Sequence, residues 1–356
     1  MEEPTDTAKT NARPTNATTV HRSNRRVIPI IEVTIGPPSE RVQPPKQSLQ
    51  FARGRKRAVD AACRLLGAQV AIGAAAIFAR FALTGAGPIV VAALRLAIAT
   101  LIVFALARRV ERLATRREVA FAVAGLALAL HLAVWFASLR YTSVAIATLL
   151  VTTTPLWTEL YDVAVRRRTP SRAFSLALLS ASGGVALIAL PGTSTPAPVY
   201  GHAALGATLA LVGSVAIAAY LLIVRDAGRT SEHECLGTRQ IVARTYGWAT
   251  LALAAAAWFA HETPPPPDAR TAWAGILAMA LISQLLGHTL LNAALASFAP
   301  STVALTTLLE PVIAALLAAA LFREALAPTT VAGGLLVLLG VAVTLATSRD
   351  AAQSRT

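Results

Sequence analysis

The feature that most constrains this chain is an internal repeat within long apolar stretches. His131 recurs as His288 and Pro155 as Pro311, about 156 or 157 positions later. The run Gly184-Val185-Ala186 likewise recurs as Gly340-Val341-Ala342. A duplicated unit with an odd number of membrane spans must lie in the membrane in opposite orientations, which is typical of alternating-access transporters. The repeat therefore favours a carrier over an enzyme.

Composition predicts an all-α membrane protein. Apolar residues make up 55% of the sequence and charged residues 14%, and the apolar residues fall in blocks of roughly 20. These blocks are rich in Ala and Leu, and because Ala is a poor strand residue they argue against a membrane β-barrel. We expect ten transmembrane helices, at residues 63–83, 88–107, 118–139, 143–165, 172–190, 202–224, 239–260, 271–295, 301–322 and 328–347.

The arginines predict the orientation of these helices. If the N-terminus is cytoplasmic, the inner loops carry most of the arginines, and the outer connections hold only Arg140, Arg270 and Arg323. This is the positive-inside pattern, and it puts both termini in the cytoplasm. The formal net charge of +14 is then a topology signal and not a sign of nucleic-acid binding. We expect an integral protein of a bacterial plasma membrane, in contact with the lipid bilayer.

The N-terminal segment differs from the rest. Residues 1–60 hold seven prolines and eleven Lys or Arg, without the apolar region of a signal peptide. A disordered cytoplasmic tail fits this composition, and a misassigned start site is the alternative. We therefore expect four parts: a basic, Pro-rich tail at 1–61, a first five-helix repeat at 62–191, a second at 192–348, and a cytoplasmic C-terminal tail at 349–356.

Several motifs resemble a known family. Segments 131–145 (HLAVWFASLRYTSVA) and 152–157 (TTTPLW), with 287–295 (GHTLLNAAL) and 309–312 (LEPV), resemble the two halves of an EamA-type permease of the drug/metabolite transporter superfamily. The resemblance covers about residues 62–347. It implies two inverted five-helix repeats around a central cavity. The first, third and fourth helices of each half line this cavity. It says almost nothing about the substrate.

Two prolines predict kinks at equivalent places in the fourth and ninth expected helices. Pro155 and Pro311 lack a backbone N–H, so they free the carbonyl oxygens of Val151 and Thr307. Groups freed at membrane depth must be satisfied by protein or water, and neighbouring threonines lie close enough to help. The kinks either serve packing alone or also act as hinges that open hydrogen-bonding groups to a substrate.

Glu310 is the most costly residue of the chain. An ionised carboxylate near the middle of a membrane helix costs about 2.5 kcal/mol or more, so it must pair, face water or be protonated. One interpretation is a neutral side chain that is hydrogen-bonded at the kink. The other is a role in cation recognition or proton coupling. The first half offers uncharged Thr154 at the matching position, a further candidate for substrate contact.

Other polar residues are candidates for substrate binding or coupling. His131 and His288 could bind a polar substrate or carry protons if both face one cavity, although a hydrogen bond between helices explains either one alone. Trp135 and Asn292 follow four residues later, on the same helical faces. If those faces point inward, an aromatic ring and an amide would suit an amphipathic substrate; if they do not, Trp135 is an ordinary packing residue. Arg95, inside the second expected helix, is a candidate partner for an anionic group, and snorkelling or interhelical pairing is the alternative.

Some charged and small residues are expected to be structural. Arg80 and Arg244 should snorkel or pair between helices, and Glu159 and Asp162 should form an ion pair with the arginines at 166–168. The pairs Gly183-Gly184 and Gly333-Gly334 suit tight helix packing.

The sequence argues against other function classes. His233-Glu234 is followed by Cys235 and lacks the second histidine of a zinc site, and Gly-x-Ser-x-Gly is absent. No Gly-x-x-x-x-Gly-Lys loop is present, which favours a gradient-driven carrier over an ATP-driven one. We expect no enzyme, cofactor or metal, and a small-molecule substrate. Our first hypothesis is an exporter of amino acids or related compounds that works by alternating access. The alternatives are a drug or nucleotide-sugar transporter of the same fold, or a membrane sensor that does not transport.

Overall fold

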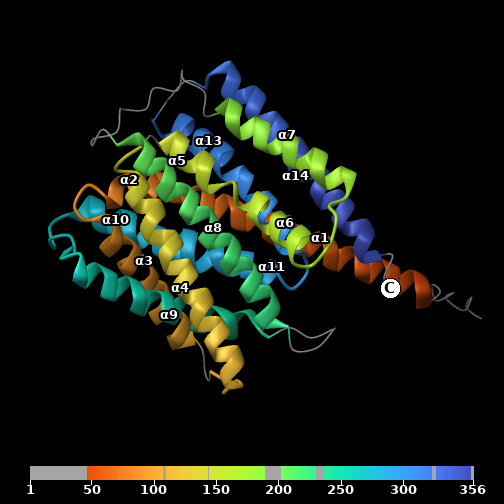
Figure 1. The fold of residues 1–356 in the computed structure, drawn as a ribbon, viewed down its shortest axis with the longest axis horizontal. Coiled ribbons are helices and arrows are strands. Elements are labelled where there is room, and N and C mark those ends of the chain that lie inside the picture. Colours follow the sequence, from red (N-terminus) through yellow and green to blue (C-terminus); the bar gives the residue numbers. More distant parts are fainter. Residues whose placement is uncertain are drawn as a thin grey trace, which may run out of the picture. The chain divides into compact units, whose positions relative to one another are not determined.

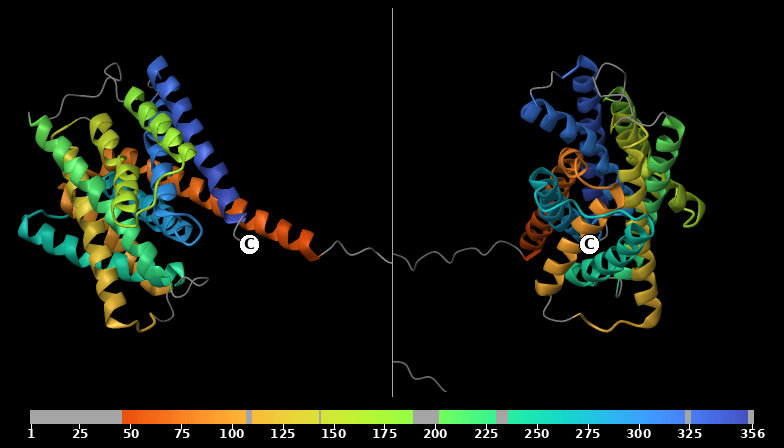
Figure 2. Two further views of the ribbon diagram at one scale, coloured as in Figure 1. Left: turned by 45° about the vertical axis from the view of Figure 1, so that its right-hand side comes forward. Right: turned by 90° about the vertical axis from the view of Figure 1, so that its left-hand side faces the viewer.

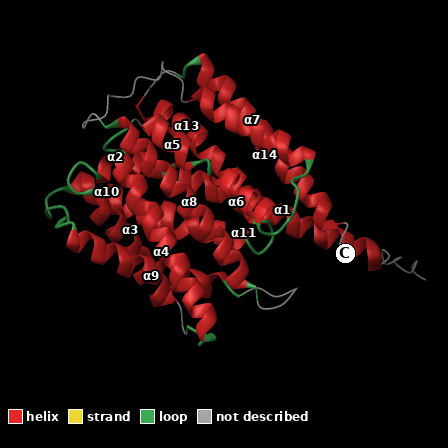
Figure 3. Ribbon diagram, in the orientation of Figure 1, coloured by secondary structure: helices red, strands yellow, loops and turns green. Residues whose placement is uncertain are grey.

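The computed structural model describes residues 46–106, 110–142, 144–188, 202–229, 236–322 and 326–353. All regular elements within these ranges are helices (Figure 3). This confirms the predicted all-α class for the described part of the chain.

The helices fall into two series that follow the expected repeats (Figure 1). The first series is α1 (Lys46–Gly73), α2 (Ala75–Ala82), α3 (Pro88–Leu106), α4 (Thr115–Ser138), α5 (Val144–Val151), α6 (Thr154–Ala164) and α7 (Arg172–Ile188). The second is α8 (Ala203–Gly228), α9 (Thr238–Phe259), α10 (Arg270–Ala278), the π-helix η1 (Met279–His288), α11 (Thr289–Ala294), α12 (Pro300–Thr306), the 3₁₀ turn η2 (Thr307–Leu309), α13 (Glu310–Phe322) and α14 (Pro328–Gln353).

Seven helical segments of the described part are long and apolar enough to cross a membrane. They are Val59–Ala82, Pro88–Leu106, Thr115–Ser138, Ala204–Gly228, Arg270–Ala294, Pro300–Leu321 and Pro328–Thr347. Each overlaps one of the expected spans. Helix α7 is apolar but shorter, whereas α9 and the broken pair α5–α6 do not meet the same criteria. The chain is therefore built to span a membrane, and the number of ten spans stays a prediction.

The first helix begins earlier than expected. Residues 46–61 belong to α1, although we expected them to be disordered. This stretch is rich in Lys, Arg, Gln and Ala, which are good helix formers, and it extends a helix that the apolar span has already nucleated. At the other end, α14 continues through 349–353 of the expected C-terminal tail. The rest of the expected N-terminal tail, residues 1–45, lies outside the described residues.

Each helix of one series packs against a helix of the other, and helices at matching positions in the two series make matching contacts. Helices α1 and α2 pack against α10, η1 and α11, and the first helix of the second series, α8, packs against α4. Helix α3 packs against α9, and α7 packs against α14. A two-fold relation between the halves requires such a pattern, because each helix then meets the counterpart of its own partner.

Small residues bring α7 and α14 together, and the two helices lie side by side in the views of Figure 1 and Figure 2. A Cβ atom added to Gly184 would lie 2.4 Å from the carbonyl oxygen of Gly333, and one added to Gly340 would lie 2.5 Å from that of Ala177. The prediction of tight packing is confirmed for Gly184 and Gly333. A Cβ on Gly183 would meet nothing within 4 Å, so that glycine is not needed for the contact.

Candidate functional site

A cavity of about 60 Å³ lies where the two halves meet. It is lined by Ile72, Gly73, Ala75, Ala76, Arg95, His131, Leu132, Trp135, Thr148, Val151, Thr152, Thr154, Ile217, Leu221, His288, Leu291, Thr307, Glu310 and Ala314. These residues belong to the first, third and fourth spans of each half, as the family resemblance implies, with Arg95 of α3 in addition. A space of this size holds roughly four water molecules, so a larger substrate requires the cavity to open.

Six of the seven predicted binding or coupling residues line this cavity, namely Arg95, His131, Trp135, Thr154, His288 and Glu310. The seventh, Asn292, is fully buried beside it. Its amide oxygen accepts a hydrogen bond from the Tyr220 hydroxyl at 2.7 Å, and its amide nitrogen donates to the backbone oxygen of His288 at 2.8 Å. Asn292 therefore supports the helix that carries His288 and does not itself face the cavity.

The helix break at Pro155 is satisfied by hydroxyl groups. Helix α5 ends at Val151 and α6 begins at Thr154, next to the proline. The carbonyl oxygen of Val151 accepts a hydrogen bond from the Thr154 hydroxyl at 2.9 Å. The hydroxyl oxygens of Thr153 and Thr154 lie 3.0 and 3.3 Å from that of Ser214 in α8. The kink and the help from a neighbouring threonine are both confirmed here.

The break at Pro311 is satisfied in another way. Helix α12 ends at Thr306, and the 3₁₀ turn η2 follows before α13 begins at Glu310. The backbone N–H of Glu310 donates to the freed oxygen of Thr307, so the tighter turn supplies the donor. The hydroxyls of Thr306 and Thr307 bond instead to Val303 and Ala304, at 2.7 Å each. The kink is confirmed, but the expectation that threonine hydroxyls satisfy the freed oxygen is wrong in this half.

Glu310 lines the cavity from the start of α13. Among the described residues, none forms a hydrogen bond or ion pair with its carboxyl group. The backbone of α1 lies close to it, since a Cβ on Gly73 would be 3.4 Å from the Cα of Glu310. A carboxyl group in this position must face water or a ligand, or carry a proton.

The two histidines share the cavity but differ in their partners. Nδ1 of His131 lies 2.9 Å from the carbonyl oxygen of Gly213 in α8, so it ties two helices together. The His131 ring lies parallel to that of Trp135, with 6.5 Å between ring centroids. By contrast, Nδ1 of His288 and Nε1 of Trp135 are buried without a hydrogen-bond partner in the described part of the chain. Both nitrogens are available to a ligand.

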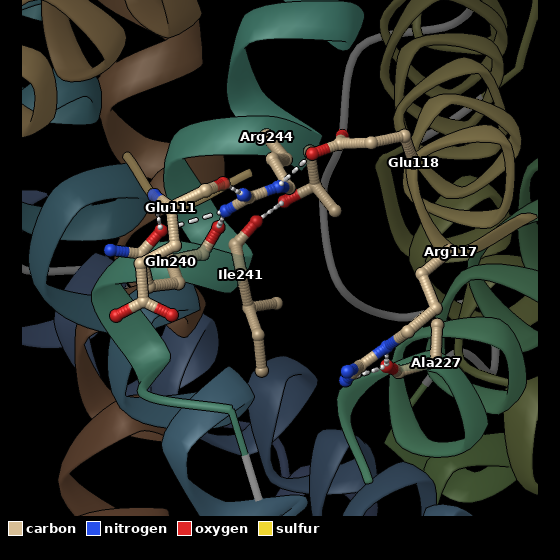
Figure 4. Close-up of polar contacts among 8 residues, drawn as sticks. Glu111, Arg117, Glu118, Ala227, Gln240, Ile241 and Arg244 are labelled. Atoms are coloured by element: carbon tan, nitrogen blue, oxygen red, sulfur yellow. Dashed lines mark hydrogen bonds and ion pairs between the residues drawn. The ribbon is translucent and has the colours of Figure 1, made fainter. Parts of the chain in front are cut away.

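Arg244 shows what a structural arginine looks like in this fold (Figure 4). Its Nε donates to Glu118 Oε1 at 2.8 Å, and its Nη1 donates to the side-chain and backbone oxygens of Gln240 at 2.8 and 3.0 Å. Its Nη2 donates to the backbone oxygen of Glu111. The predicted interhelical pairing of Arg244 is confirmed, and its hydrogen bonds hold α9 to neighbouring parts of the fold.

Arg95 is buried but less fully engaged. Its side chain is 1% exposed, and its Nη2 donates to Gln284 Oε1 at 2.7 Å. The guanidinium carbon lies 5.8 Å from the centroid of the Phe136 ring. The Nε atom has no partner in the described ranges, and no ion pair there joins Arg95 to Glu310. Arg95 is a buried cation with hydrogen-bonding capacity left for an anionic group.

A second cavity, of about 380 Å³, lies at the end of the molecule where the arginine-rich loops gather. It is lined by Asp162, Arg166, Arg168, Arg225, Asp226, Arg229, Ala299 and Pro300. Arg166 pairs with Asp162 at 3.2 Å and with Asp226 at 2.7 Å, which confirms the predicted ion pair for Asp162, whereas no ion pair of Glu159 is found among the described residues. Burial lowers the pKa of Arg166, but the hydrogen bond and charge of Asp226, with the charge of Asp162, outweigh it and raise the pKa overall. This cluster holds helices together and lies apart from the central cavity.

The sequence matches the model of the EamA-like transporter family at residues 61–190 and 204–346. The chain belongs to the EamA-like transporter family. The protein is therefore an integral membrane transporter of the drug/metabolite type, with a small-molecule substrate, and its family is one of transporters rather than enzymes.

The fold of this EamA-like transporter also resembles that of a protein solved by crystallography. The two share 20% sequence identity with a TM-score of 0.66, over 82% of this chain and 98% of the other. At this identity the likeness shows the fold alone. No curated protein matches the sequence.

Sequence reasoning missed two features of the EamA-like transporter's cavity. The π-helix η1 lies where we expected an ordinary α-helix, and Gln284 within it is the partner of Arg95. A π-helix within an α-helical span is frequent at functional sites. The available signal was Ser283-Gln284, a polar pair inside an otherwise apolar span. Within the described residues, no group of three or more His, Cys, Asp or Glu side chains could hold a metal ion.

Proposed function

We propose that this EamA-like transporter is a secondary carrier that exports amino acids or closely related metabolites from a bacterial cytoplasm. The observation that supports this most is the presence of opposite charges on one cavity, Arg95 and Glu310, which no direct ion pair joins among the described residues. An α-amino acid carries a carboxylate and an ammonium group, so it can meet both. The unpartnered nitrogens of His288 and Trp135 offer further hydrogen bonds to such a substrate.

The proposed mechanism is alternating access by two inverted five-helix repeats, at 62–191 and 192–348. In this proposal the chain has ten spans and both termini are cytoplasmic, and Pro155 and Pro311 are hinges at which α6 and α13 change direction. The reciprocal packing of the two halves supports a two-fold relation. A reporter fused after Pro267 should lie outside the cell and one fused after Thr169 inside. Both reporters on the same side would contradict the inverted arrangement.

Glu310 is the proposed coupling residue. Its carboxyl group has no partner among the described residues, so it can take up a proton in one state and release it, or bind the substrate ammonium, in another. Proton uptake would then alternate with substrate binding as the two halves rock. This proposal needs no ATP, because the proton gradient supplies the free energy.

The function can be tested with the purified full-length protein in liposomes that contain no nucleotide. Labelled amino acids are loaded inside, and efflux is followed with an imposed pH gradient, without one, and after addition of a protonophore. We expect efflux that the gradient accelerates and the protonophore slows. Efflux no faster than from empty liposomes, for every amino acid tried, would refute the proposal.

A further inference from the structure

We infer that Gln284 is a positioning residue that makes the cavity selective for substrates with a carboxylate. It does so by holding the buried guanidinium of Arg95 without neutralising it. The inference rests on the proposed function and adds to it the part of the substrate that Arg95 recognises.

The contact between the two side chains is direct. Gln284 is fully buried, and its Oε1 accepts the hydrogen bond from Arg95 Nη2 at 2.7 Å. An amide oxygen orients a guanidinium but carries no net charge, so the cation keeps its attraction for an anion. A carboxylate in the same position would form an ion pair with Arg95 and cancel that attraction. The choice of amide over acid at residue 284 is thus what leaves the positive charge available.

Gln284 is itself held in place by the second half. Its backbone oxygen accepts a hydrogen bond from the Tyr246 hydroxyl at 3.2 Å, and that hydroxyl lies 3.3 Å from the Thr289 hydroxyl. Tyr246 is fully buried on α9, two residues from the firmly bonded Arg244. A continuous set of contacts therefore runs from α9 through η1 to Arg95 and the cavity.

Helix η1 carries both Gln284 and His288. They lie four residues apart in η1, about one turn, so Gln284 reaches Arg95 while His288 lines the cavity. The Nε2 of Gln284 and the hydroxyl of Ser283 are buried without partners in the described ranges, which shows that hydrogen bonding within η1 is not what fixes the amide. The contact to Arg95 is the one polar interaction of the Gln284 side chain in this part of the chain.

The apolar lining supplies a suitable test substrate. Ile72, Leu132, Ile217, Leu221 and Leu291 surround the polar groups, which favours an aliphatic side chain. Leucine fits this description. Isoamylamine is the same molecule without its carboxylate, and isocaproate is the same molecule without its amino group. The three compounds separate recognition of the carboxylate from recognition of the rest.

The experiment measures KM and kcat for these three compounds in proteoliposomes, for the parent protein, Gln284→Glu, Gln284→Met and Gln69→Glu. In Gln284→Glu, KM for leucine should rise about tenfold or more, with kcat nearly unchanged and KM for isoamylamine constant or lower. Gln284→Met removes the hydrogen bond without adding charge, so its rise should be smaller, about threefold. Gln69→Glu is the matched control, because Gln69 is a fully buried amide that bonds to Thr306 and does not touch Arg95. It should leave the ratio of leucine KM to isoamylamine KM unchanged.

The outcomes separate the two proposals. Transport of isocaproate but not leucine by the parent protein would refute amino-acid export, and the Gln284 variants would then be judged on isocaproate. An equal rise of KM for leucine and isoamylamine in Gln284→Glu would show a merely structural role and overturn the inference. Transport of isoamylamine alone by the parent protein would overturn both.

Discussion

The two halves of the molecule line one cavity with different chemistry. At two repeated positions the first half uses its polar groups within the protein, because His131 is tied to Gly213 and the Thr154 hydroxyl is tied to Val151. In the second half, the described residues form no hydrogen bond or ion pair with the Glu310 carboxyl group, and Nδ1 of His288 has no hydrogen-bond partner there. A repeated fold therefore supplies matching positions, and substitutions at those positions decide which of the repeated residues keep polar groups free for a ligand.

The largest expected difference between the halves concerns proton coupling. Glu310→Gln keeps the size of the side chain but cannot titrate, so transport should no longer depend on the pH gradient. Initial rates of leucine transport with and without an imposed gradient measure this. Because the described residues provide no partner for the carboxyl group, Glu310→Ala should leave the melting temperature of the purified protein at or above that of the parent. An unaltered pH profile in Glu310→Gln would make Glu310 a structural residue.

The contact between the last helices of the two halves should be the most sensitive to added volume. Gly184→Ala puts a methyl group 2.4 Å from the Gly333 carbonyl oxygen, and we expect a loss of roughly 1–3 kcal/mol in the free energy of unfolding. Gly183→Ala is the matched control, since its methyl group meets no neighbour and should change stability by no more than about 1 kcal/mol. Denaturant titration in detergent micelles tests both. Equal effects at the two positions would contradict the close approach.

Loss of a hydroxyl group at the Pro155 kink should cost more stability than loss of one within a regular helix. Thr154→Val leaves the Val151 oxygen without a donor, because Pro155 has no N–H, and should cost about 1–2 kcal/mol of stability. Thr208→Val is the control on exposed α8 surface, where the hydroxyl donates to Ala204 within an unbroken helix at 2.9 Å. Its melting temperature should stay close to that of the parent. If Thr208→Val is as damaging as Thr154→Val, the hydroxyl is not replacing the missing donor.

Substitution of His131 should affect mainly the stability of the protein, and substitution of His288 mainly its transport. His131→Phe removes the hydrogen bond to Gly213 and should lower the free energy of unfolding by about 1 kcal/mol. His288→Phe removes a ring nitrogen that has no partner among the described residues, so it should raise KM for leucine with little change in stability. The same assays serve both variants. A reversed pattern, with His288→Phe the less stable protein, would mean that the ring of His288, and not that of His131, is held by the protein.

Features that depend on composition and repeated residues could be predicted from the sequence. The helical class, both breaks at proline, the pairing of Arg244 and six of the cavity residues follow from apolar block length, missing N–H groups and the cost of burying charge. Each of these arguments uses one residue type in a known environment. None requires knowing which side chain lies opposite.

The features that escaped prediction depend on particular tertiary contacts. In a span that is apolar on all sides, the spacing of apolar residues does not distinguish an α-helix from a π-helix. The sequence therefore gives no signal for η1 beyond the polar pair Ser283-Gln284. Asn292 was expected to face the cavity because it lies four residues after His288, but the buried Tyr220 hydroxyl provides a partner for its amide elsewhere. Helix α1 extends back to Lys46 because the span provides a nucleus that composition alone does not reveal.

In the proposed alternating-access mechanism, the close packing of α7 and α14 bears on the energy balance of the transport cycle. The approach of Gly184 to Gly333 has its counterpart in that of Gly340 to Ala177, so the two contacts exchange when the halves exchange roles. An interface that is its own image contributes equally to an outward-open and an inward-open conformation. It can therefore strengthen the protein without favouring either conformation. The resting population of the two states must be set where the halves differ, at Glu310 against Thr154 and at η1 against the regular helix α4.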